Sequence, residues 1–125
     1  EKDPIPDNPI VEIGSLLSAC YDRMEGHRNR LNYTTDTDVY VKVDDENYIF
    51  ISMNGNGCYF VEKKHLYKSD KYVIMEMDVR LLIKILKGPR FAHWDNADTG
   101  SHIFYRKKPN VHERGIYHTI CFFHR

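Results

Sequence analysis

The spacing of apolar residues changes once along this chain of 125 residues, and that change limits the folds open to it. Residues 10–24 carry apolar side chains three and four positions apart, which predicts one buried face of a helix. Residues 38–62 alternate instead and are rich in Val, Tyr, Ile and Phe, which predicts strands. The helical stripe consists of Ile10, Ile13, Leu16, Leu17, Cys20, Tyr21 and Met24.

Two short polar segments divide the alternating region. "DDEN" and "NGNG" are rich in residues that form tight turns, and Gly and Asn tolerate a positive φ. The sequence therefore predicts three antiparallel strands, at about 38–43, 47–53 and 57–62. "KYVIMEM" predicts a further strand, with Tyr72, Ile74 and Glu76 on one face and Val73, Met75 and Met77 on the other.

The helices differ in how well their ends are marked. Residues 1–9 contain three prolines and are expected to form an extended lead-in, although Gly14-Ser15 could also cap a shorter first helix. "MDVRLLIKILKGP" predicts a second helix that Asp78 caps and Gly88-Pro89 ends. Its predicted buried stripe is Val79, Leu82, Ile83 and Leu86.

The secondary structure of the C-terminal part is harder to predict from the sequence. "SHIFYRK" predicts a short strand, whereas "ERGIYHTICFFHR" fits a strand or a helix about equally well. Strands grouped before helices favour one α+β domain over residues 10–125. We expect a mainly antiparallel sheet of about five strands with helices packed on one face.

Composition excludes several classes of protein. Hydrophobic content of 42% and charged content of 29% fit an ordered globular chain. The 18 basic and 18 acidic residues balance, which argues against nucleic acid as the principal partner. No apolar run approaches the roughly 18 residues of a membrane span. Three dispersed cysteines among apolar neighbours predict buried thiols in a cytoplasmic protein, and a chain that begins with Glu1 could be a piece of a longer one.

The segment around the only tryptophan carries the main chemical alternative. His93, Asp95, Asp98 and His102 supply imidazoles and carboxylates, so a small metal-dependent or acid–base enzyme is one hypothesis. The segment lacks an HxxxH pair on a predicted helix, and nothing in the spacing turns both imidazoles to one side. We therefore assign no catalytic residue, no metal ligand and no cofactor.

The last part of the chain, about residues 70–125, resembles a sterol-carrier-protein-type domain. It is similar to the accessory C-terminal segment behind some metallo-β-lactamase-fold hydrolases. Arg106 and Pro109 stand one residue further apart than in the R-x-P turn of that pattern. The other matching positions are Asp78, Leu81, Leu82, Ile85, Leu86, Gly88, Trp94, Asp95, Asn96, Ala97, Gly100, Phe122, Phe123 and His124.

The resemblance implies a sterol-carrier-like fold, either with a tunnel for an apolar ligand or as a dimerisation or substrate-covering module of a parent hydrolase. The metal motif of such hydrolases is absent, so their catalysis is not carried over. We expect a non-catalytic domain that binds a lipid or another hydrophobic small molecule, or else a structural homodimerisation module. Asp95, Asn96 and Arg106 are expected to be structural. The predicted ligand-binding residues are Leu82, Leu86, Phe91, Trp94, Phe104 and Phe122.

Overall fold

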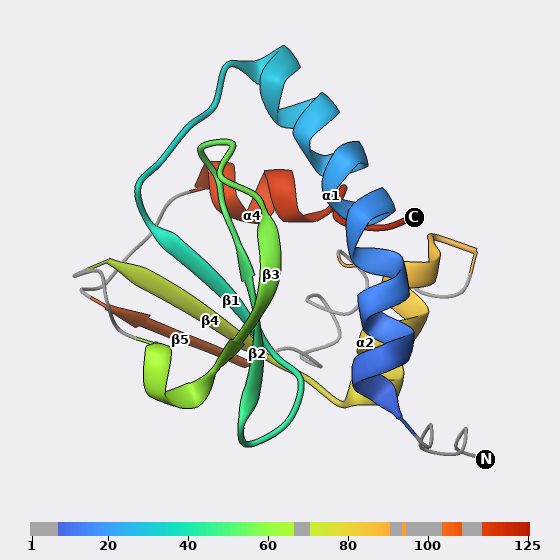
Figure 1. Cartoon of the computed structure of the whole chain (residues 1–125). Coiled ribbons are helices and arrows are strands. Elements are labelled where there is room, and N and C mark those ends of the chain that lie inside the picture. The colour runs from blue at the N-terminus through green and yellow to red at the C-terminus, as the bar shows by residue number, and fades with distance from the viewer. Residues whose placement is uncertain (1–7, 67–70, 91–93, 95–103, 109–113) are drawn as a thin grey trace.

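A computed structural model gives the architecture of the chain (Figure 1). It describes residues 8–66, 71–90, 94, 104–108 and 114–125, with the backbone alone for 104–108. The elements in chain order are α1 (Pro9–Leu31), β1 (Asp38–Lys42), β2 (Asn47–Ile51), β3 (Cys58–Glu62), the short 3₁₀ helix η1 (Lys63–His65), β4 (Tyr72–Glu76), α2 (Val79–Lys87), β5 (Phe104–Lys108) and α4 (Arg114–Ile120).

The first helix, α1, is longer than the alternative helix that Gly14-Ser15 would have capped. Asn8 caps it by accepting a hydrogen bond from the backbone nitrogen of Val11 at 3.3 Å, and Pro9 occupies the first turn. α1 therefore begins one residue before the expected boundary and runs without interruption through Gly14. It ends at Asn32, which adopts the left-handed conformation with φ of 52°.

The five strands in the described part of the chain form one sheet in the order β3-β2-β1-β4-β5. Three neighbouring pairs are antiparallel, while β1 and β4 are parallel and place Val39 beside Val73. Asp44 closes the first turn through its carboxylate, which accepts from the backbone nitrogens of Glu46 and Asn47. The expected α+β class, strand number and mainly antiparallel character are thus confirmed.

Helices α1, α2 and α4 lie on one face of this sheet (Figure 1). The main core joins apolar side chains of α1, α2 and α4 to alternate residues of the strands, such as Val41, Ile49 and Met75. A second, smaller cluster occupies the opposite face and includes Tyr40 and Ile74. The alternation predicted for β4 is confirmed, since residues next to each other along the strand belong to different clusters.

The end of α2 forms a junction with the C-terminus. Asp78 caps the helix through a 2.8 Å hydrogen bond from the backbone nitrogen of Arg80, as the sequence predicts. The carbonyl oxygen of Leu86 accepts from the thiol of Cys20 at 3.4 Å and from the backbone nitrogen of Arg125 at 2.8 Å. Gly88 has φ of 127°, and a Cβ there would lie 3.0 Å from the carbonyl oxygen of Arg125.

The undecided last element is a helix. Ile116, Thr119 and Ile120 are buried at the spacing of a helix, and the chain turns immediately after residue 120. The predicted strands 38–43, 47–53 and 57–62 are each one or two residues shorter in the structure. Division of the chain into a lead-in and one domain remains a prediction.

Candidate functional site

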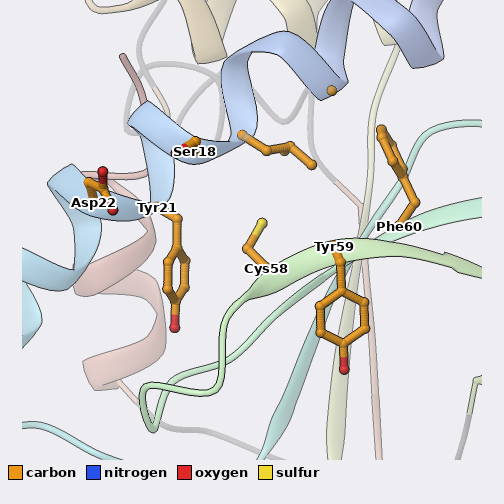
Figure 2. A pocket seen from close by; sticks show the side chains of 8 residues that line it. Ser18, Tyr21, Asp22, Cys58, Tyr59 and Phe60 are labelled. Carbon is orange, nitrogen blue, oxygen red and sulfur yellow. The ribbon is translucent and has the colours of Figure 1, made fainter.

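A groove of about 480 Å³ opens between α1 and the edge strand β3 (Figure 2). Cys58 and Phe60 point from β3 toward the helix, and Tyr59 points the opposite way, as the pleat of a strand requires. The described residues that line the groove are Gly14, Leu17, Ser18, Tyr21, Asp22, Cys58, Tyr59 and Phe60.

The space exists because small residues occupy one side of α1. Gly14 and Ser18 lie four positions apart, so they share a helical face. A Cβ at Gly14 would already lie 3.4 Å from the ring of Phe60. A larger residue at either position would therefore extend into the groove, whereas Leu17 and Tyr21 provide its apolar walls.

Tyr21 holds one end of the groove in place. Its hydroxyl donates to the carbonyl oxygen of Ser52 and accepts from the backbone nitrogen of Gly57, each at 3.1 Å. Both partners lie in the connection between β2 and β3, residues 52–57, where Gly55 and Gly57 have positive φ. Burial raises the pKa of Tyr21, so the hydroxyl keeps the proton that it donates.

The thiol of Cys58 lines the groove, whereas Cys20 belongs to the main core. Burial raises the pKa of Cys58 to about 12, and burial also raises the pKa of Cys20 to about 12. Both sulfurs are therefore protonated near neutral pH, and a thiol in that state is a poor nucleophile. All three cysteines are free thiols, but the predicted burial is confirmed only for Cys20, since Cys58 and Cys121 are half-buried.

The polar rim of the groove carries negative charge. Asp22 is exposed and is the charged residue among the described ones that line the groove, and the hydroxyl of Ser18 lies on the same helix. A ligand with a carboxylate at this rim would face a like charge without a lining cation to offset it. The rim favours a neutral or cationic end group.

The described residues among the predicted ligand-binding set do not line this groove. Leu82, Leu86 and Trp94 are all buried in the main core, and Phe122 is half-buried in a stack against His27. Phe91 and the side chain of Phe104 lie outside the described residues. None of these six residues is among the described lining of the groove, and a pocket beneath Trp94 stays a prediction.

The structure does not test the predicted polar and metal-binding residues. Asp95, Asn96, His93, Asp98 and His102 lie outside the described residues, as does the side chain of Arg106. In the described part of the chain, no group of three or more His, Cys, Asp or Glu side chains could hold a metal ion. The same part has no helix that is long and apolar enough to cross a membrane.

Sequence reasoning missed this groove, although one signal was present. Leu17 and Tyr21 belong to the predicted apolar stripe, and the structure confirms that Leu17 is buried. Gly14 and Ser18 mark the neighbouring line of the helix, where two small residues predict a gap against whatever packs there. Periodicity alone cannot say that β3 lies opposite, because strand order is set by tertiary pairing.

No protein-family model and no curated protein matches the chain. Among solved structures, the chain is similar to one described as "UbiJ-SCP2 Ubiquinone synthesis protein". The two share 16% identity over 96% of each chain, with a TM-score of 0.47. A likeness at this identity and TM-score carries no argument about a ligand, and it offers no counterpart to the resemblance to metallo-β-lactamase-fold hydrolases.

Proposed function

We propose that the chain is a non-catalytic binding domain that holds a neutral, elongated apolar molecule, such as a long-chain alcohol or a sterol, between α1 and β3. The groove of about 480 Å³ carries this proposal. Ligand pockets in proteins commonly enclose roughly 300–1,000 Å³ and combine apolar walls with a few polar groups. Leu17, Tyr21 and Phe60 supply such walls, and Ser18 with Asp22 supplies the polar end.

The chemistry of the rim supports a neutral end group. The hydroxyl of Ser18 can donate a hydrogen bond to a ligand hydroxyl or carbonyl oxygen. Asp22 can accept one from a ligand hydroxyl, but it repels a carboxylate. We therefore expect dodecanol to bind more tightly than dodecanoate, which has the same chain length.

A fluorescent neutral sterol, NBD-labelled cholesterol, tests occupancy of the groove directly. The intact chain should bind it saturably, and dodecanol should displace it at lower concentration than dodecanoate. Ser18→Trp places an indole in the groove and should weaken binding by on the order of tenfold or more. Ala19→Trp is the matched control, because Ala19 is exposed on the same helix but does not line the groove.

Three outcomes oppose the proposal. Absence of saturable sterol binding, or equal loss of binding in both tryptophan variants, would show that the groove is not the site. Tighter binding of dodecanoate than of dodecanol would exclude the neutral class. Asp22→Asn tests the charge preference separately from the location of the site. It should improve dodecanoate binding and leave dodecanol binding nearly unchanged.

Other hypotheses from the sequence remain proposals of lower rank. An accessory role beside a parent hydrolase, a homodimerisation module and a cytoplasmic location have no further support from the described residues. The groove does not depend on any of them, because α1 and β3 of one chain supply all its described lining.

A further inference from the structure

Two histidines from opposite ends of the chain meet on the helical side of the molecule. His27 lies on α1 and His118 on α4, and their Nε2 atoms are 3.4 Å apart. Phe122 stacks on the ring of His27, with centroids 3.6 Å apart and planes inclined by 18°. This contact fixes the plane of one imidazole beside the other.

The separation of the two nitrogens fits a shared ion well. Hydrogen bonds from nitrogen usually span about 2.7–3.2 Å between heavy atoms, so 3.4 Å is long for a direct bond. Two Zn–N bonds of about 2.0–2.1 Å at a tetrahedral angle place their nitrogens about 3.3–3.4 Å apart. The observed distance therefore also fits two imidazoles that bind one cation.

We propose that His27 and His118 form a two-histidine site for a divalent first-row transition-metal cation, with zinc as the expected occupant. Imidazole nitrogen suits Zn²⁺, Cu²⁺ and Ni²⁺ better than it suits Mg²⁺ or Ca²⁺. His118 is exposed and His27 is half-buried, so water or an external ligand can complete the coordination. The site shares no residue with the described lining of the groove, and the proposal is independent of the proposed function.

The charged surroundings bear on how strong such a site is. Burial, His118 and Arg30 together lower the pKa of His27, so Arg30 is the nearby cation that opposes a metal ion. Arg30 is exposed, and water and salt screen its charge. Bound zinc would join α1 to α4 and should stabilise the folded chain by mass action.

Calorimetry with ZnCl2 tests the site on the whole chain after treatment with a chelator. At neutral pH we expect one zinc ion per chain and a higher Tm in the presence of zinc. His27→Ala and His118→Ala should each weaken this binding by on the order of a hundredfold, because each leaves a single ligand. His65→Ala, which changes an exposed histidine on η1, is the matched control and should leave it unchanged.

Two separate variants are needed because one of them could lose zinc binding simply by misfolding. His118 is exposed, so its replacement should preserve the circular dichroism spectrum even if His27→Ala disturbs the stack with Phe122. Loss of zinc binding in a folded His118→Ala chain supports the site. Absence of zinc binding in the parent chain, or equal binding in the parent and the folded His118→Ala chain, overturns it.

Discussion

The indole nitrogen of Trp94 lies 2.9 Å from the carbonyl oxygen of Phe123 and donates a hydrogen bond to it within the core. Trp94 is 2% exposed and Phe123 is fully buried. This bond connects a residue that follows α2 to the last residues described in the chain. It gives the only tryptophan a structural role, whatever ligand the protein binds.

Trp94→Phe should lower the free energy of unfolding by roughly 2–3 kcal/mol. The change removes the donor, leaves the buried carbonyl of Phe123 unpaired and reduces the packed volume. Urea denaturation followed by far-ultraviolet circular dichroism measures it without tryptophan fluorescence. Tyr59→Phe alters an exposed ring and should change stability by less than about 0.5 kcal/mol. An unchanged urea midpoint for Trp94→Phe would show that the bond contributes little.

Arg28, in the last turn of α1, forms a buried network of hydrogen bonds. Arg28→Lys should therefore lower the free energy of unfolding by roughly 1–3 kcal/mol. Arg28 is 5% exposed; its guanidinium pairs with both carboxylate oxygens of Glu25 and donates to the carbonyl oxygen of Tyr33 at 2.8 Å. Lysine cannot reproduce this planar arrangement of donors. Arg30→Lys, at an exposed position on the same helix, is the control, and equal losses in both variants would contradict the network's importance.

Asp38→Asn should stabilise the protein near neutral pH. Burial raises the pKa of Asp38 in the folded state, and the hydroxyl of Tyr40, 3.3 Å away, opposes that rise to a smaller extent. The folded chain therefore binds this proton more tightly than the unfolded chain, so ionisation of Asp38 costs stability as the pH rises through the folded pKa. The advantage of the asparagine should shrink as the pH falls toward the unfolded value of about 3.9.

Urea midpoints at about pH 7 and about pH 4 measure this effect. Asp36→Asn changes an exposed carboxyl two residues earlier and serves as the control. A destabilised Asp38→Asn chain at neutral pH would show that the carboxylate makes a compensating contact. An effect of the same size at both pH values would show that charge is not its cause.

Thr119→Val should raise stability by about 1 kcal/mol. Thr119 is fully buried on α4, and within the described part of the chain its hydroxyl has no hydrogen-bond partner. Valine has nearly the same shape and removes the cost of burying that hydroxyl. Thermal unfolding of the variant, beside the exposed Thr34→Val as control, gives the result. A lower Tm for Thr119→Val would mean that the hydroxyl is satisfied in solution.

The sequence predicted α2 well because its signals are local. Asp78 and Gly88 mark its two ends within the sequence itself, and Leu82 and Leu86 lie one turn apart on its buried face. The last helix could not be decided because only seven residues form it, and its tyrosine, threonine and isoleucines also suit a strand. What fixes it as a helix is packing of Ile116 and Ile120 into the core.

The candidate site shows the same division between local and distant information. Ser18 and Tyr21 can be placed on a helix from their neighbours, but Phe60 comes to face them only through the pairing of strands. The contact between His27 and His118 likewise depends on the packing of α1 against α4, and no residue spacing in the sequence predicts it. Motif searches along the chain therefore miss both features.

The parallel pairing of β1 with β4 has a consequence for the speed of folding. Its partners, such as Val39 and Val73, are separated by β2, β3 and η1, so the centre of the sheet closes only after a long loop has been ordered. The β2–β3 hairpin has no such delay. We expect early formation of that hairpin and a rate-limiting step at the central pair, so that Val39→Ala slows refolding more than Val61→Ala does.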